Sequence, residues 1–266
     1  MNPPIVQGAT QELLGVPISA LTMDEVLKRI HTAIVGHRRL QIGVVNAAKL
    51  VNMRRDHTLR SDVLSSDLIL ADGVPVVWAS RLLGRPLPER VAGIDLMLAM
   101  LRRGNEHGYR VYCLGASDDV LAAAVNRITV DYPHVEVVGR HHGYFSLEDE
   151  PGIVAAIVDA KPDILLVAMS SPKKERFLAR WSDQIAVSIC HGVGGSFDVL
   201  AGKVRRAPPS LQRLGCEWLY RVYQEPRRLW RRYLITNTLF CVLVIKELFR
   251  QRLPARSAMT RAKRKA

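Results

Sequence analysis

A single carboxylate stands where a strand is expected to end. The apolar run Leu68–Ala71 predicts a buried strand, and Asp72-Gly73 ends it just before an apolar helical pattern begins. Open α/β sheets bind ligands at the carboxyl ends of their strands, so Asp72 is a candidate catalytic residue, and Gly73 leaves room for a substrate near the backbone. The plainer interpretation is a turn aspartate, because Asp before Gly is common in turns.

Three other turns that follow predicted strands contain small residues. They are Gly115 to Ser117, Ser170 to Pro172 and Gly192 to Ser196. Each can present backbone N–H groups at a helix start, which is how many α/β proteins bind phosphates. Helix packing also selects glycine, but together the turns favour a nucleotide or diphosphate across the strand ends. The sequence has neither a Walker A loop nor a GxGxxG fingerprint, so no ATP or nicotinamide cofactor is expected.

The sequence does not predict a metal site. No two aspartates stand two residues apart, so the DxD pair that holds a divalent cation in many nucleotide-sugar enzymes is missing. The charge of a diphosphate leaving group would then have to be met by Arg, Lys and helix ends. The arginine-rich C-terminal region could contribute only by folding back onto the rest of the chain.

Strands alternate with helices over the first 200 residues or so, which predicts a mostly parallel, Rossmann-like α/β sheet covered by helices on both faces. We expect an edge strand at Val16–Ile18. The other expected strands are Leu40–Val45, Leu68–Ala71, Arg110–Leu114, Val135–Gly139, Ile164–Ala168 and Ile185–Cys190.

The C-terminal region has a different character. Two helices are expected, over Ser210–Gln224 and Pro226–Arg252. From Lys203 to the end there are 17 Lys and Arg but only three acidic residues, whereas the first 202 residues contain 21 basic and 22 acidic residues. This charge, interleaved with Trp and Tyr, is typical of helices on an anionic membrane surface, although a solvated basic face is the plainer reading. We therefore expect an α/β domain over 12–208, a basic helical appendage over 209–252 and a disordered tail over 253–266.

Composition sets further bounds. The chain has 266 residues, 48% of them hydrophobic, which is ample for a packed core. Four scattered cysteines suggest neither a disulfide framework nor a zinc knuckle and favour a reducing compartment. We expect no signal peptide and no transmembrane segment, because the longest apolar run is far shorter than the roughly 20 residues that a spanning helix needs.

Several separated motifs together resemble one family, the WecG/TagA/CpsF glycosyltransferases. The matching segments, which extend from about Val16 to Leu234, are VVNAAKLV, ADGVPVVW, RVAGIDL, GAS, GYF, SSPKKE and GVGGSFDVLAGKVRRAPPSLQRLGCEWLYRVYQEPRRLWRRY. The last segment is long enough to be highly specific. The resemblance implies an inverting, metal-independent hexosyltransferase that is peripheral at the cytoplasmic face of a bacterial membrane. Such an enzyme moves a sugar from a UDP-sugar donor to a polyprenyl-diphosphate-linked sugar in surface polysaccharide synthesis.

The resemblance also assigns roles to residues. Asp72 matches the aspartate proposed as general base for the acceptor hydroxyl, and Asn46 is counted with it among the catalytic residues. Asn46 and Arg90 resemble contacts to the acceptor or donor sugar. The expected nucleotide site comprises Ser171, Lys174, Glu175, Gly194 and Gly195, with Gly115 from the small-residue turns. Arg221, Arg228 and Arg231 of the appendage are expected at the diphosphate.

Two positions depart from the family pattern. Val44 stands where many members have Thr, and Lys174 where they have Gln before the Glu of SPKQE. The first removes a hydroxyl near the expected reaction centre, and the second adds a cation near the expected nucleotide site. Both departures bear on the donor sugar. The first candidate is a GumM-like exopolysaccharide branch that uses UDP-glucose, and UDP-N-acetylmannosamine or its uronic acid is the next.

Two other classes of function remain open at this point. The basic C-terminal helices could bind nucleic acid, with Trp and Tyr stacking on bases. This reading is disfavoured because the first 202 residues carry a net charge near −1 and cannot build a long cationic groove. The other alternative is a non-catalytic scaffold of a polysaccharide assembly complex. The sequence also leaves open whether copies of the chain form a homo-oligomer.

Overall fold

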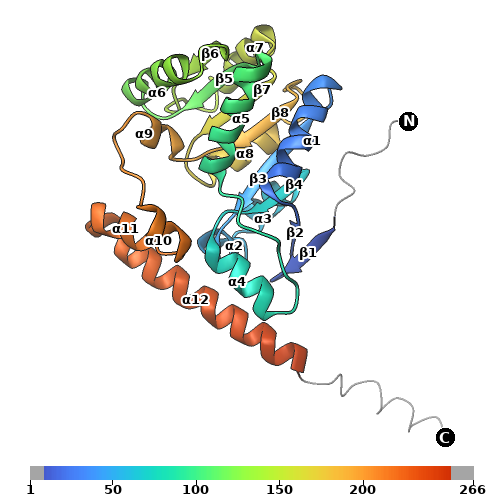
Figure 1. Cartoon of the computed structure of the whole chain (residues 1–266), viewed down its shortest axis with the longest axis vertical. Coiled ribbons are helices and arrows are strands. Elements are labelled where there is room, and N and C mark those ends of the chain that lie inside the picture. The colour runs from blue at the N-terminus through green and yellow to red at the C-terminus, as the bar shows by residue number, and fades with distance from the viewer. Residues whose placement is uncertain (1–8, 253–266) are drawn as a thin grey trace, which may run out of the picture.

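A six-stranded parallel sheet forms the centre of the molecule, as the computed structural model shows for residues 9–252 (Figure 1). Its strand order is β4-β3-β8-β7-β5-β6, and every neighbouring pair is parallel. The strands are β3 (Leu40–Val45), β4 (Leu68–Ala71), β5 (Arg110–Gly115), β6 (Glu136–His141), β7 (Ile164–Ala168) and β8 (Ile189–Gly192). The expected α/β class is confirmed.

Helices cover both faces of this sheet because successive strand residues point to opposite sides. In β7, for example, Ile164 and Leu166 join one core cluster, whereas Leu165 and Val167 join another. The first cluster includes residues from α1 (Met23–Val35), α5 (Gly93–His107), α6 (Asp118–Asp131) and α9 (Ser196–Leu200). The opposite face is covered by α2 (Ala47–Asn52), α3 (His57–Leu64), α4 (Val74–Leu82), α7 (Glu150–Ala160) and α8 (Lys173–Arg180).

The N-terminal part contains a second, smaller sheet. Strand β1 (Thr10–Leu13) pairs antiparallel with β2 (Val16–Ser19), so the expected edge strand is present but does not join the main sheet. Residues 1–8 lie outside the described part of the chain, and the strand that begins at Thr10 was not foreseen.

The last strand begins later than the sequence predicts. Ile185 and Val187 are buried as expected, but they fill the core beside α8 from an irregular segment, and β8 begins only at Ile189. Apolar residues indicate that a segment is buried, but a short apolar run does not by itself show that its backbone pairs with a neighbouring strand. The prediction of a strand over 185–190 was therefore wrong at its first four residues.

The C-terminal helices turn back along the body. The single helix expected over 210–224 is broken into α10 (Pro209–Arg213) and α11 (Glu217–Gln224), because Gly215 has a left-handed φ of 67°. Helix α12 (Pro226–Arg252) has the expected bounds and runs along one edge of the molecule (Figure 1). Its Phe240 and Val244 pack in one cluster with Leu50 and Val51 of α2.

The predicted tail over 253–266 lies outside the described residues. Between residues 9 and 252, no helix has both the length and the apolar character needed to cross a bilayer.

Candidate active site

Asp72 lies at the carboxyl end of β4, where its side chain is held by the start of another helix. Its Oδ1 accepts a 2.9 Å hydrogen bond from the backbone N–H of Gly93, the first residue of α5. The first N–H groups of a helix have no partner within the helix, so this contact satisfies one of them. On the other side of Gly93, the carbonyl oxygen accepts a 3.1 Å hydrogen bond from Nε2 of the buried His191. The carboxylate of Asp72 is thereby held between the end of β4 and the start of α5.

Asn46 follows the neighbouring strand, β3, and faces Asp72. Its Oδ1 caps α2 by accepting from the Lys49 backbone N–H at 3.0 Å, which fixes the orientation of the side-chain amide. Its Nδ2 then points to Asp72 Oδ2 at 3.5 Å, the long limit of a hydrogen bond. Strands β3 and β4 are adjacent and parallel, so the structure brings these two predicted catalytic residues together.

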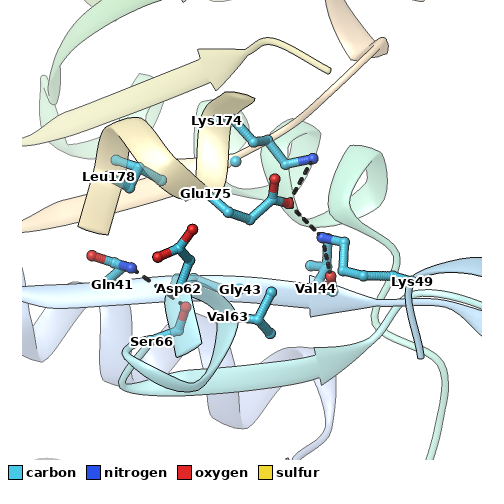
Figure 2. Close-up of a pocket in the computed structure, with 12 residues that line it drawn as sticks. Gln41, Gly43, Val44, Lys49, Asp62, Val63, Ser66, Lys174, Glu175 and Leu178 are labelled. Carbon is cyan, nitrogen blue, oxygen red and sulfur yellow. Dashed lines mark hydrogen bonds and ion pairs between the residues drawn. The ribbon is translucent and has the colours of Figure 1, made fainter. Parts of the chain in front are cut away.

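A buried ionic cluster lies beside this pair. One oxygen of Glu175, Oε1, is 2.7 Å from Lys49 Nζ and 3.2 Å from Lys174 Nζ (Figure 2). Lys49 also donates a 2.7 Å hydrogen bond to the carbonyl oxygen of Val44. Burial raises the pKa of Glu175, but the two ammonium groups outweigh it and lower that pKa to about 2. Burial and the charge of Lys174 lower the pKa of Lys49 from its ordinary value.

The other oxygen of Glu175, Oε2, is buried beside a small cavity. A cavity of about 20 Å³ lies between β3, α3 and α8, and Glu175, Asp62, Gln41 and Ser66 help to line it (Figure 2). Glu175 Oε2 and Asp62 Oδ2 are buried without a hydrogen-bond partner among the described residues. Burial raises the pKa of Asp62. The carboxylate of Glu175 thus offers Oε1 alone to the two lysines.

Four charged side chains attach the C-terminal helices to the start of α5. Arg90 lies 2.9 Å from Asp95 and 3.0 Å from Glu217 of α11, and Arg206 lies 2.6 Å from the other oxygen of Asp95. With two arginines and two carboxylates, this cluster is balanced in charge. Since α5 also supplies Gly93, the appendage and Asp72 are anchored to the same helix start.

The appendage also approaches the segment that follows Asp72. A Cβ placed on Gly215 would lie 3.0 Å from Cβ of Val74, the first residue of α4. The turn between α10 and α11 therefore rests against the start of α4, two residues beyond Asp72.

The remaining predicted residues occupy several parts of the same edge. Gly115 ends β5 opposite Ala168 of β7, whose carbonyl oxygen would be 2.4 Å from a Cβ at this position, so a side chain cannot fit. Ser171 is exposed just before α8, Gly194 has a φ of 57°, and Gly195 precedes α9. These residues come from strands that end at one edge of the sheet.

The arginines of the appendage are placed differently. Arg221 and Arg231 are exposed, and among the described side chains neither forms an ion pair or hydrogen bond with the residues at the strand ends. Arg228 lies in α12, and its side chain falls outside the described part of the structure. Arg90, expected to contact a sugar, is engaged with Asp95 and Glu217. The candidate roles of these four residues remain predictions.

Sequence reasoning missed several polar residues at this edge. They are Lys49, Asp95, His191, Arg206 and Glu217. A signal for Lys49 existed, because a lysine in the apolar segment AAKLV three residues after a helix-capping Asn is expected to need a buried partner. No three His, Cys, Asp or Glu side chains between residues 9 and 252 gather as ligands for a metal ion.

The fold and the site define an α/β enzyme that binds its ligands across the carboxyl ends of a parallel sheet. The sequence model of one family, described as "Glycosyl transferase WecG/TagA/CpsF family", matches residues 11–254. The chain therefore belongs to this family of glycosyltransferases, as its motifs indicated.

Curated relatives are similar over much of the chain. A protein of Bacillus spizizenii is 38% identical over 170 residues, or 64% of this chain and 65% of that protein, slightly less than two thirds of its length. Proteins of Staphylococcus aureus strains MW2 and NCTC 8325 are 34% identical over 225 residues, or 84% of this chain and 88% of each relative. All three are named N-acetylglucosaminyldiphosphoundecaprenol N-acetyl-beta-D-mannosaminyltransferase.

Proposed function

We propose that this protein transfers a hexose from a UDP-sugar to a sugar carried on polyprenyl diphosphate, with inversion at the anomeric carbon and without a metal ion. The observation that carries the proposal is the fixed carboxylate of Asp72 at the strand ends, with Oδ1 bound by Gly93 and Oδ2 facing Asn46. The relatives' names, which describe transfer to a diphosphoundecaprenol-linked sugar, support the acceptor class.

In this mechanism Asp72 is the general base. It removes the proton of the acceptor hydroxyl while that oxygen attacks the anomeric carbon, and the nucleoside diphosphate leaves from the opposite face. Because Gly93 occupies Oδ1, the proton goes to Oδ2, the oxygen that Asn46 approaches. Positioned proton transfer of this kind contributes roughly 10²- to 10⁴-fold in rate. Asn46 orients the carboxylate and is near enough to contact a sugar hydroxyl.

The donor is expected to lie along the same edge. Gly115, Ser171, Gly194 and Gly195 leave backbone and small side chains near the ends of β5, β7 and β8, where a diphosphate can approach closely. Lys174 and Glu175 lie beside this region. The departures at Val44 and Lys174 bear on the choice of donor, for which UDP-glucose is the first candidate. The relatives' names favour UDP-N-acetylmannosamine, and its uronic acid is the third candidate.

The appendage is proposed to bind the anionic inner surface of a bacterial membrane, where the lipid-linked acceptor resides. Helix α12 buries Phe240 and Val244 against the body but exposes Trp230, Ile245 and Phe249. Its exposed arginines can attract anionic headgroups, and its exposed apolar residues can enter the interface. The ion pair between Arg90 and Glu217 attaches α11, which precedes this helix, to the body.

The test is transfer of labelled sugar into an organic-extractable lipid by the purified protein. Acceptors are polyprenyl-diphosphate-linked glucose and N-acetylglucosamine, and donors are UDP-glucose, UDP-N-acetylmannosamine and its uronic acid, each with and without chelator. The proposal predicts label in the lipid from one donor, unchanged by chelator. Membrane binding with no transfer from any donor to either acceptor would instead favour a non-catalytic scaffold, and loss of transfer with chelator would refute metal independence.

A further inference from the structure

Lys174 is a buried cation whose charged end lies at the carboxyl end of β8. Its side chain is 10% exposed, and its stem crosses Gly192, where an added Cβ would lie 2.9 Å from Lys174 Cε and 3.0 Å from Cδ. The ammonium then ends 3.8 Å from the position that a Cβ on Gly194 would take. Because Gly192 and Gly194 have no side chains, the side chain of Lys174 can reach the turn that follows β8.

The ionic cluster around Lys174 has more cations than carboxylates in direct contact. Two lysines share one oxygen of Glu175, and the carboxylate of Asp62, which lines the same cavity, forms no ion pair with either lysine among the described residues. Lys49 is well satisfied by Glu175 and by the Val44 carbonyl oxygen. Within residues 9–252, the ammonium of Lys174 has one ion pair, the 3.2 Å contact with Glu175, and donates no hydrogen bond. An ammonium group has three donors, so Lys174 has capacity for an anionic ligand.

The position of Lys174 along the sheet indicates which anion this is. Asp72 ends β4, and Lys174 reaches the end of β8, which is two strands away in the order β4-β3-β8. In an inverting displacement, the base and the departing phosphate lie on opposite faces of the reacting carbon, so they are met by different groups along the strand ends. Lys174 ends at a strand other than the one that carries the base, so it can contact the leaving group.

We propose that Lys174 binds the β-phosphate of the nucleoside diphosphate and stabilises the charge that this phosphate gains on leaving. The bond from the anomeric carbon to the diphosphate oxygen breaks, and its electron pair goes to that oxygen. The acceptor oxygen forms the new bond, and its proton goes to Asp72. Lys174 keeps its own protons and supplies charge-assisted hydrogen bonds. The inference rests on the proposed function and adds a specific role for one residue within it.

The experiment compares the affinities of UDP and UMP by titration calorimetry, because only UDP has the β-phosphate. In Lys174→Gln we expect UDP to bind about 10- to 100-fold more weakly, as for the loss of one charged hydrogen bond, and UMP to bind within about twofold of the original protein. Lys174→Arg keeps the charge and should retain the preference for UDP over UMP. Lys49 still pairs with Glu175 in both variants, so both should fold, which thermal unfolding checks.

The control is Arg176→Gln on the same helix. Arg176 is exposed and pairs at 3.6 Å with Asp56, so this variant should bind both nucleotides as the original does. Equal weakening of UDP and UMP in Lys174→Gln, or unchanged UDP binding, would overturn the inference. If the original protein bound neither nucleotide, the proposed UDP-sugar donor itself would be refuted.

Discussion

The backbone N–H of Gly93 donates a 2.9 Å hydrogen bond to Oδ1 of Asp72, which leaves Oδ2 as the oxygen that can take a proton. Asp72→Asn keeps an oxygen acceptor for Gly93 but removes the base. We expect transfer to fall by roughly 10²- to 10⁴-fold, with thermal unfolding nearly unchanged. Initial rates of lipid labelling measure the first quantity and calorimetry the second.

A matched control exists at the other end of the same strand. Asp67 precedes β4 and accepts a 2.7 Å hydrogen bond from the Gln41 backbone N–H, so Asp67→Asn makes the same chemical change at the amino end of the strand, away from the candidate active site. Its transfer rate should stay near that of the original protein. Near-normal transfer by Asp72→Asn would remove Asp72 from the mechanism.

Glu175 should make stability depend on acid pH. Its folded pKa of about 2 lies below the ordinary value of 4.5, so it stabilises the fold fully above that ordinary value, and this contribution is lost as pH falls toward 2. Glu175→Gln leaves two buried lysines without their carboxylate and should cost about 3 to 5 kcal/mol near neutral pH. Urea unfolding should show the difference between the two proteins shrinking as pH falls below about 4.5.

The control for this prediction is Glu136→Gln. Glu136 pairs with Arg110 in an exposed bridge, so its loss should cost about 0 to 1 kcal/mol. A Glu175→Gln variant as stable as the original at neutral pH would contradict the account of the buried cluster.

Substitutions of two phenylalanines on α12 test separately whether this helix packs on the body and whether it contacts the membrane. Phe240 is 5% exposed in the cluster with α2, so Phe240→Ala should lower the free energy of unfolding by about 3 to 5 kcal/mol. Phe249 is 64% exposed, so Phe249→Ala should leave stability unchanged but weaken binding to anionic vesicles. Denaturation and vesicle sedimentation measure the two effects. Vesicle binding by Phe249→Ala equal to that of the original would place the membrane contact elsewhere.

The contact between Arg90 and Glu217 should restrain the appendage. Both side chains are partly buried, and Glu217→Gln removes one carboxylate from the four-charge cluster. A loss of about 1 kcal/mol should speed amide hydrogen exchange in α10 and α11 about fivefold. Exchange in β5 and β7 should not change. Unaltered exchange in both helices would show that other contacts attach the appendage.

Local patterns were sufficient to predict most of the sheet and the position of Asp72. The run Leu68–Ala71 and the following Asp-Gly pair specify a strand end within six residues, and the structure places Asn46 at the end of the adjacent strand. Patterns also predicted α12 with its bounds. These features depend on residues close together in the chain.

Features that depend on distant residues were not predictable. Lys49 and Glu175 are separated by 126 positions, and nothing in a single sequence pairs them. The packing of Phe240 on α2 likewise appears only in three dimensions. The break between α10 and α11 was missed because the helical periodicity on both sides outweighed the signal of Gly215.

The most direct test of inverting transfer by one base is the anomeric configuration of the product. The transferred sugar can be released with its acceptor sugar from the lipid and examined by NMR. A donor with an α-linked UDP group should give a β-linked product, because one displacement assisted by Asp72 inverts the carbon. An α-linked product would show that the configuration is retained, and would contradict the mechanism.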